Sequence, residues 1–342
     1  MDQRPRLEDV AARVGVSTAS VSLVLRGAPG PSAATRERVL TAAAELGYRP
    51  DRTASLLARR RRHLLGVMMD VHNPFHAEVV EEIYAAADRI SYEVVLSTLT
   101  RDRDENRAVE TLLDFRCEAV LLIGPDSSNG TLDKLASQVA VVAIGRRVLC
   151  AGIDVVRSAD DVGVGAALSH LIELGHQQIA FVDGGRGAIA MARRRGYRTA
   201  MRRAGLGSAI RIIDGDHTEE GGIRAGKLLA AATDRPSAVV ASNDRCAVGL
   251  MDSFLRAGLD VPRQISVVGY DDSSLARLAH IDLTTVNQDA PEQARQAVAA
   301  AVSRLDSHRG GRREVVLRPR LIVRGSTARP GFGSGSVGSA YS

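Results

Sequence analysis

The first fifty residues carry apolar positions at the spacing of short amphipathic helices. Apolar residues recur every three or four positions from residue 7 to residue 14, and Gly15 then permits a tight turn. Ser17 can cap a second helix, whose apolar face is expected at Val21, Val24 and Leu25. A third helix is predicted over residues 32–46, so that three short helices share one small core.

From residue 63 onward, apolar runs of strand length alternate with stretches of helix length. This alternation is typical of repeated β-α-β units, in which helices cover a parallel sheet. The pattern runs through one series and then restarts, which predicts an α/β core of two parallel-sheet lobes. The expected strands are 64–69, 93–98, 119–124, 139–144, 178–183, 210–213, 238–242 and 265–270, and the expected helices are 75–90, 105–115, 131–138, 160–174, 193–204, 219–232 and 244–257. A last helix (291–305) and strand (314–323) are expected to return the chain across the lobes.

Length and composition narrow the class of protein. The 342 residues suffice for a small module and a larger one with its own core. No apolar run approaches the roughly 20 residues of a membrane span, and no export signal is recognisable. We therefore expect a cytoplasmic protein with no membrane partner. The cysteines Cys117, Cys150 and Cys246 lack metal-ligand spacing and read as reduced core thiols, so neither a metal nor a cofactor is expected.

Positive charge is concentrated at the amino end. Residues 1–62 contain twelve arginines and six acidic residues, a net charge of +6 where the whole chain has +5. Such an excess can be a solvated surface, and amphipathic helices can be a simple docking module. The second helix, however, begins with small hydroxyl residues, which suits insertion of its amino end into the major groove of DNA.

The same stretch resembles the DNA-binding headpiece of the lactose/galactose repressor family of bacterial transcriptional regulators. The resemblance rests on residues 7–22 (LEDVAARVGVSTASVS), 32–39 (SAATRERV), 46–52 (LGYRPDR) and 54–58 (ASLLA). It is specific, because it is contiguous over almost sixty residues. By this resemblance the base-reading positions are Thr18, Ala19 and Leu23, and the sugar-phosphate contacts are Ser17, Ser22, Thr35 and Tyr48, with Arg52 also able to reach phosphate.

Leu23 departs from the family, which usually has Arg or His at this position. A leucine cannot donate a hydrogen bond to guanine but can contact a thymine methyl group, which favours a shifted operator preference.

The resemblance also implies a hinge helix that folds on operator DNA. It covers residues from Thr53 to Arg60, including Ala54, and Leu57 matches the side chain that is inserted at the central base step of the minor groove. The alternative is that Leu57 is a core residue of a linker helix.

The resemblance continues into the core, whose family fold is similar to periplasmic sugar-binding proteins. It is carried by residues 73–75 (NPF), 170–179 (HLIELGHQQI), 242–244 (SND), 267–272 (VVGYDD) and 283–286 (LTTV). Ligands of open α/β sheets bind at the carboxyl ends of the strands, so two facing lobes are expected to enclose a ligand between them.

Candidate effector contacts follow predicted strands. Asp271 can accept hydrogen bonds from vicinal hydroxyls and Arg193 can donate a forked pair, and both match regular ligand positions of the family. The alternative is a surface carboxylate and an arginine of a basic run. His217 stands where the family often has an aromatic ring that stacks on the ligand. Further candidates are Phe75, His76, Arg146 and Asn243.

Parts of the sequence also fit two other classes of protein, an enzyme and a transport receptor. Residues 185–190 (GRGAIA) fit part of a dinucleotide-binding fingerprint, which would indicate an NAD-dependent enzyme, but the match lies deep in the chain and is weak. The core alone would also fit a sugar-binding transport receptor. The fit of Arg193 to the regulator family argues against the enzyme, and the headpiece and the lack of a recognisable export signal argue against the receptor. We therefore predict a non-enzymatic regulator.

The sequence thus predicts a helix-turn-helix headpiece (1–50), a hinge (51–62), a two-lobed effector-binding and dimerisation core (63–327) and a disordered Gly- and Ser-rich tail (328–342). A homodimer is expected to bind a palindromic operator, because two headpieces double the base contacts. The expected function is repression of carbohydrate-utilisation genes, relieved by a sugar. A nucleobase or nucleoside that promotes DNA binding is the alternative within the same family.

Overall fold

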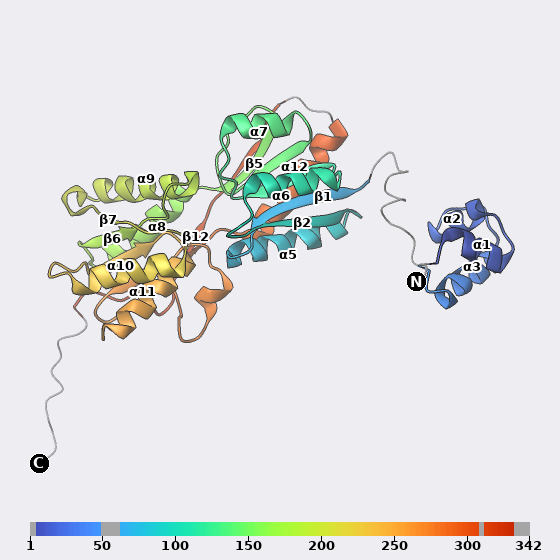
Figure 1. Cartoon of the computed structure of the whole chain (residues 1–342). Helices are drawn as coiled ribbons and strands as arrows, with labels where there is room; N and C mark the ends of the chain where they lie inside the picture. The colour runs from blue at the N-terminus through green and yellow to red at the C-terminus, as the bar shows by residue number, and fades with distance from the viewer. Residues whose placement is uncertain (1–4, 49–61, 308–310, 332–342) are drawn as a thin grey trace, which may run out of the picture. The chain divides into compact units, whose positions relative to one another are not determined.

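The computed structural model describes residues 5–48, 62–307 and 311–331. The chain divides into two units, Met1–Arg62 and His63–Ser342, which are a helical headpiece and a larger core (Figure 1). Within the described ranges, no helix is long and apolar enough to cross a membrane. The predicted fold class is confirmed: a helix-turn-helix headpiece precedes an α/β core of two parallel-sheet lobes.

Three helices form the headpiece: α1 (Leu7–Val14), α2 (Thr18–Leu25) and α3 (Ala33–Glu45). α1 ends at Gly15, whose φ of 71° is a left-handed conformation that glycine adopts without strain. Ser17 and Ser32 cap α2 and α3, because each hydroxyl oxygen accepts a hydrogen bond from the amide three residues later. The apolar faces meet in one core of Val10, Ala11, Val14, Val21, Val24, Val39, Ala42 and Ala43.

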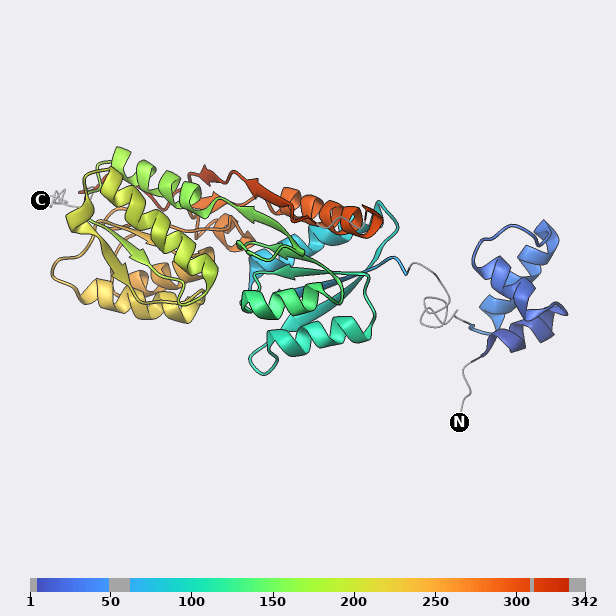
Figure 2. The same cartoon turned by 90° about the horizontal axis from the view of Figure 1, so that it is seen from above.

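A six-stranded parallel sheet forms the first lobe, called the N-lobe. Its strands lie in the order β11-β5-β4-β3-β1-β2. Helices α5 and α12 cover one face and α6 and α7 the other, as Figure 2 shows, and burial of both faces explains the unbroken apolar strands. The elements are β1 (Leu64–Asp70), α5 (Pro74–Asp88), β2 (Glu93–Leu99), α6 (Glu105–Asp114), β3 (Ala119–Ile123), α7 (Asn129–Ala136), β4 (Ala140–Ile144), β5 (Ile153–Ser158), α12 (Ala290–Ser307) and β11 (Glu314–Leu317).

A four-stranded parallel sheet in the order β7-β6-β8-β9 forms the second lobe, called the C-lobe. Helices α8 and α9 pack on one face and α10 and α11 on the other. The elements are α8 (Asp160–Glu173), β6 (Ile179–Val182), α9 (Ala188–Arg203), η1 (Gly207–Ala209), β7 (Arg211–Ile213), α10 (Glu219–Ala231), β8 (Ala238–Ala241), α11 (Asp244–Arg256), β9 (Ser266–Val268) and η2 (Ser274–Arg277). β10 (Thr285–Asn287) and β12 (Arg320–Ile322) form an antiparallel pair beside it.

The chain passes between the lobes three times. It leaves the N-lobe after β5, returns after β10 and leaves again between β11 and β12. The single strand predicted over residues 314–323 is therefore wrong. Pro319 interrupts it, because proline has no amide hydrogen for a strand ladder, and the two halves join different sheets.

Two strands, β5 and β10, were not predicted from the sequence. β5 carries the charged Asp154 and Arg157, which break the apolar pattern of a buried strand. Asp154 is buried and pairs with Arg304 of α12 at 2.8 Å, and Arg157 pairs with Glu314 of β11 at 2.7 Å. Both partners lie more than a hundred residues away in the sequence, so the local pattern gave no sign of them. Helix α9 also starts earlier than predicted, at Ala188 instead of Arg193.

The ordered part of the chain extends beyond residue 327, where the disordered tail was expected to begin. The amide of Ala328 donates to the hydroxyl of Ser266 at 3.0 Å, and its carbonyl lies 2.8 Å from the imidazole of His176. Ala328 is therefore part of the C-lobe, and residues 332–342 lie outside the described residues.

The packing of α8 on α9 makes a test of the fold. A Cβ on Gly196 of α9 would lie 2.9 Å from the Cα of Asp161, whereas a Cβ on Gly165 of α8 would meet nothing within 4 Å. Gly196→Ala is expected to destabilise the core by about 1–3 kcal/mol, whereas Gly165→Ala is expected to stabilise it by up to about 1 kcal/mol through helix propensity. Urea unfolding of the two variants measures both effects. A shift in the same direction for both would contradict this packing.

Candidate nucleic-acid interface and ligand cleft

The headpiece places several predicted DNA contacts at the amino end of α2. Ser17, Thr18 and Ala19 are exposed there, while Ser22 and Leu23 are half-buried. Neither α2 nor α3 has an acidic residue in its first turn, so the positive end of each helix dipole is not neutralised. The amino end of α2 can therefore approach a phosphate with its free amides.

The other predicted headpiece contacts are held by local structure. Thr35 is half-buried in the first turn of α3, with its hydroxyl 3.0 Å from that of Ser32. Tyr48 packs against the edge of the helical core. Leu23 lies beside the loop at Gly30, where an added Cβ would be 3.8 Å from its side chain. The remaining predicted contacts, Arg52, Ala54 and Leu57, lie outside the described residues.

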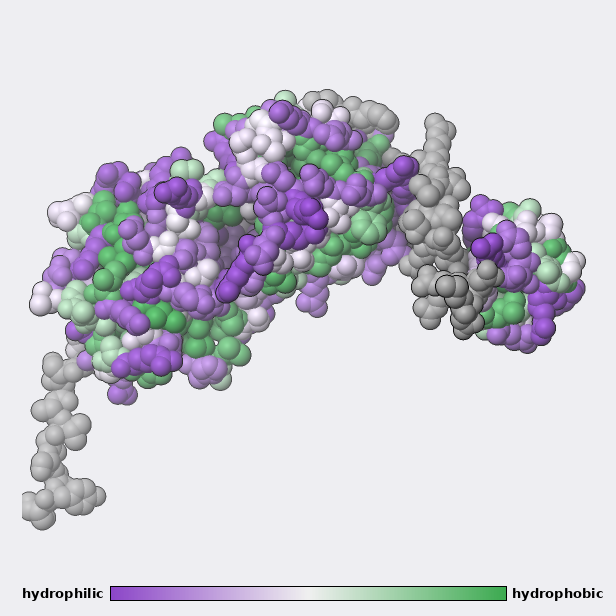
Figure 3. All heavy atoms as spheres, viewed as in Figure 1, coloured by the Kyte–Doolittle hydropathy of each residue, from purple (hydrophilic) through white to green (hydrophobic). Residues whose placement is uncertain are grey.

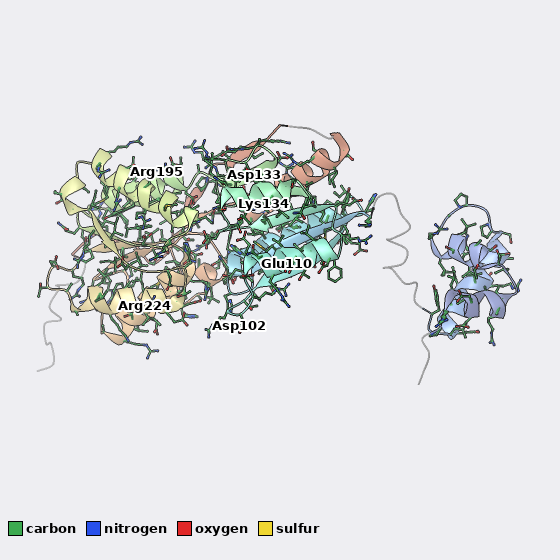
Figure 4. The ribbon with its side chains drawn as sticks, turned by 45° about the horizontal axis from the view of Figure 1, so that its top comes forward. Asp102, Glu110, Asp133, Lys134, Arg195 and Arg224 are labelled. Atoms are coloured by element: carbon green, nitrogen blue, oxygen red, sulfur yellow. The ribbon has the colours of Figure 1, made fainter. Side chains whose placement is uncertain are left out.

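In the core, Arg193 is buried between the ends of the C-lobe strands. Its Nε donates to Asp160 at 3.0 Å, its Nη1 donates to the carbonyl of Ser242 at 2.6 Å, and Nη1 lies 3.7 Å from Asp271. The guanidinium also stacks on the ring of Tyr270 at 3.7 Å. Arg193 is 4% exposed, whereas Arg195 is exposed on the outside of α9 (Figure 4), so Arg193 is not part of a surface basic run.

Asp271 is held in a demanding backbone conformation. Its φ is 121° and that of Asp272 is 55°, a region that non-glycine residues seldom adopt and that often marks functional sites. The side chain of Gln288 donates to the Asp271 carboxylate at 2.7 Å. The two carboxylate oxygens of Asp271 are thereby oriented beside Arg193, with capacity left for a ligand.

The charges of this cluster depend on one another. Burial raises the pKa of Asp271 well above its ordinary range, although Arg193 opposes the shift. Burial likewise raises the pKa of Asp160, again against the effect of Arg193. Burial disfavours the charge on Arg193, but Asp160 and Asp271 outweigh it and raise the pKa of the guanidinium. The cluster therefore holds one guanidinium group between two carboxyl groups.

Two histidines from opposite lobes, His76 and His217, lie near one another, and His217 also lies near Arg193. Burial lowers the pKa of His76, at the start of α5, to about 4. Burial, then the positive charges of Arg193 and His76, lower the pKa of His217 to about 3. Both rings are therefore neutral. The amide of Asp70 donates to Nδ1 of His76 at 3.2 Å, so the ring proton lies on Nε2 and can be donated to a ligand.

The remaining predicted effector contacts are held in place by other residues of the core. Asn243 caps α11 by accepting from the amide of Cys246 and donates to the carbonyl of His217 at 3.1 Å, so it positions that residue. Arg146 donates to the carbonyl of Ser127 at 2.7 Å and fixes the loop after β3. Phe75 is 7% exposed and packs in the core beneath α5.

Asp160, Tyr270 and Gln288 were missed from the sequence. Asp160 and Gln288 lie within two residues of the ends of β5 and β10, the two strands that the sequence pattern did not reveal. The rule that ligand groups follow strand ends could therefore not be applied to them. Tyr270 follows β9 and was taken as the end of that strand.

The lobes also touch directly. The carboxylate of Glu78 on α5 accepts from the amide of Ser274 at 2.6 Å and lies 3.3 Å from Arg277, both in η2 of the C-lobe. Among the described residues, no group of three or more His, Cys, Asp or Glu side chains could hold a metal ion. The three cysteines are free and buried.

A helix-turn-helix unit joined to two parallel-sheet lobes, with buried polar side chains at the strand ends, defines a DNA-binding transcriptional regulator with a ligand-sensing core. Residues 6–51 match the family of bacterial regulatory proteins, lacI family, and residues 168–327 match the periplasmic binding protein-like domain. The chain belongs to the lacI family.

Similar proteins cover nearly the whole chain. The ribose operon repressor of Escherichia coli (strain K12) is 31% identical over 326 residues, which is 94% of this chain and 99% of that protein. The regulator MalR of Streptomyces coelicolor is 33% identical, covering 94% and 96%. Among solved structures, the lac repressor bound to ONPG in the repressed state aligns with a TM-score of 0.83 at 29% identity, covering 95% of this chain and all of that chain. A lacI-type regulator from a Rhodococcus species aligns with a TM-score of 0.76 at 41% identity, covering 78% and 98%.

The lowered pKa of His76 gives a pH test. The unfolded chain binds this proton near pH 6.5 and the folded chain only near pH 4, so the stability of the core is expected to fall as pH drops through that window. Burial raises the pKa of Asp244 to about 6, so the protonation of Asp244 increases the stability of the core as pH drops. The contribution of His76 is therefore measured as the difference between a His76 variant and the wild type. In His76→Gln the melting temperature is expected to fall less between pH 7.5 and pH 5 than it does in the wild type. His280→Gln, which removes an exposed imidazole, is the control and should behave as the wild type does. An unchanged profile in His76→Gln would rule out a buried neutral His76.

Proposed function

We propose that this protein represses carbohydrate-utilisation genes as a homodimer on a palindromic operator, and that a sugar bound between the lobes releases it. The observation that carries the proposal is the Arg193–Asp271 pair, a buried donor and acceptor that together suit vicinal hydroxyl groups. Relatives over the full length are named as repressors of a ribose operon, and a similar regulator, CelR, has been solved as a cellobiose complex at a TM-score of 0.69.

The alternative that the effector is a nucleobase or nucleoside has less support from the aromatic side chains of the predicted site. Nucleobases are commonly held by stacking on aromatic rings. Phe75 packs in the core, and His217 and His76 offer only imidazoles. The relatives of this chain also include a protein of Photobacterium profundum named as the HTH-type transcriptional repressor PurR, which is 30% identical over 329 residues.

An enzymatic role for residues 185–190 is also poorly supported. A dinucleotide phosphate would need open space beside these glycines. The carboxylate of Asp126 lies 3.3 Å from the position of a Cβ on Gly187, the second glycine of this stretch. A carboxylate in that place would repel the pyrophosphate.

Exposed apolar side chains on both lobes support dimerisation. Figure 3 shows hydrophobic residues at the surface of the core among polar ones. Exposed examples on the N-lobe are Val71, Tyr84 and Leu96, and on the C-lobe Leu228, Leu255 and Leu278. A partner subunit would remove such surface from water.

Selection of duplex DNA from a random pool by the full-length protein tests operator binding. The selected sequences are expected to be inverted repeats, because a two-fold dimer presents two identical headpieces. Affinity should fall by about a thousandfold between 50 and 200 mM salt if six or more phosphates are contacted. A half-site duplex should bind much more weakly, and a variant lacking residues 1–62 should not bind. Selected sequences without two-fold symmetry, or binding unaffected by salt, would contradict the proposal.

Asp271→Asn tests the effector site. The substitution keeps the size of the side chain but replaces one carboxyl oxygen with an amide nitrogen, which cannot accept a hydrogen bond. This is expected to cost about 1–3 kcal/mol of effector binding, or about five- to 150-fold in affinity, without altering operator binding by the free protein. Titration calorimetry with the sugar found by thermal-shift screening measures the first effect, and anisotropy on operator DNA the second. Asp161→Asn, an exposed carboxylate on α8, is the matched control. Equal effector affinity in Asp271→Asn and wild type would remove Asp271 from the site.

A further inference from the structure

Arg26 ends helix α2 of the headpiece and turns back over it. Its main-chain amide and its side-chain Nε both donate to the carbonyl of Ser22, at 3.2 and 3.1 Å. The side chain therefore runs toward the amino end of α2, as helical side chains prefer, and the guanidinium lies beside the turn that carries Ser22 and Leu23. Arg26 is exposed, so the group is accessible to a ligand.

Arg26 lies on the face of α2 that is predicted to meet DNA. Val21 and Val24 are buried in the headpiece core, which leaves Ala19 and Leu23 on the outward side of the helix. The φ of −90° and ψ of 0° at Arg26 nearly continue the helix. Residues three and seven positions apart share one helix face, so Arg26 extends the row of Ala19 and Leu23.

The two terminal nitrogens of Arg26 have no hydrogen-bond partner among the described residues. Three other arginines of the headpiece bind a second group of the headpiece through a terminal nitrogen: Arg13, Arg36 and Arg38. Arg26 is bound through Nε, which leaves Nη1 and Nη2 free. Two such donors side by side pair with the acceptors O6 and N7 of guanine in the major groove.

The other outward side chains of α2 cannot pair with guanine in this way. Ala19 and Leu23 have no hydrogen-bond donor, and Thr18 and Ser22 offer one hydroxyl each. The arginine or histidine that is usual in the family at position 23 is therefore missing, but a guanidinium reaches the same turn of α2 from position 26.

We propose that Arg26 reads a guanine in each half of the operator. This inference rests on the proposed function, because it concerns the DNA sequence that the same headpiece binds. With α2 in the major groove, Nη1 and Nη2 donate to O6 and N7 of one guanine, while the carbonyl of Ser22 holds Nε in place. The alternative for an exposed arginine is a phosphate contact, which would carry no direct sequence information.

Selection of duplex DNA by full-length Arg26→Ala, in parallel with the wild type, tests this assignment. The wild type is expected to select inverted repeats with a guanine at a fixed position of each half-site. Arg26→Ala should select the same repeat without a base preference at that position. Replacing the guanine in one half-site should weaken wild-type binding by about tenfold or more, but binding of Arg26→Ala by about twofold or less.

A modified base isolates the contact at N7. In 7-deazaguanine a carbon replaces N7, so the base still pairs with cytosine but has lost one acceptor in the major groove. Placed at the selected position, it should weaken wild-type binding about fivefold and leave binding of Arg26→Ala unchanged.

Two further variants separate the shape of the side chain from its charge. Arg26→Lys keeps the positive charge but lacks the planar pair of donors, so it should keep the salt dependence of binding and weaken the preference for guanine. Arg6→Ala is the matched control, because it removes an exposed arginine that precedes α1. Its base preference should equal that of the wild type.

The outcomes separate this inference from the proposed function. If Arg26→Ala binds every sequence more weakly by one factor and keeps the guanine preference, Arg26 contacts a phosphate and the inference is wrong, while a regulator on an inverted repeat remains. A wild-type site without a fixed guanine, or equal losses on 7-deazaguanine in both proteins, would also overturn it. If Arg26→Ala does not fold, Arg26→Lys provides the same comparison. Failure of the wild type to select any inverted repeat would defeat the proposed function, and the inference with it.

Discussion

The buried charge of Arg193 is the constraint on which the C-lobe and the cleft both depend. A guanidinium taken out of water has to be fully paired, and removing one partner of such a pair typically costs about 3–5 kcal/mol. Here the partners come from three chain segments: Asp160 after β5, the carbonyl of Ser242 after β8 and Asp271 after β9. One side chain on α9 therefore fixes where three strand ends lie. The same pairing, with the hydrogen bond from Gln288, holds the carboxyl group of Asp271 in place beside Arg193.

This cluster is directly connected to the crossings between the lobes. Gln288, which donates to Asp271, lies where the chain passes from β10 into α12, and its carbonyl accepts from Gln293 at 2.8 Å and from the hydroxyl of Ser158 at 3.3 Å. Ser158 ends β5, just before another crossing. A change at the Asp271 carboxylate thus reaches two of the three crossings through buried hydrogen bonds. Such a network, together with the Glu78 contact to η2, is a physical route by which occupancy of the cleft can alter the angle between the lobes.

The sequence could predict the elements whose apolar pattern is local and could not predict those whose polar residues are matched by distant partners. The headpiece helices and most core strands follow from spacing alone. β5 did not, because Asp154 is compatible with a buried strand only when Arg304 is beside it, 150 positions further along. Missing β5 and β10 meant missing Asp160 and Gln288. Arg193 and Asp271 were found through family resemblance, which located them without revealing that they pair. Phe75 was assigned as an effector contact by the same resemblance, and its side chain is buried, as are those of Arg193 and Asp271.

The three crossings also determine which parts of such a protein can be exchanged with a related chain. The headpiece is one continuous segment, so a single exchange upstream of His63 would transfer its DNA-reading surface to another core. The lobes are interleaved: the N-lobe is assembled from the chain before Ala159 and from α12 and β11 near the carboxyl end, with the C-lobe inserted between. No single breakpoint separates them. DNA preference and ligand preference can therefore be inherited independently, whereas the two walls of the cleft must be inherited together.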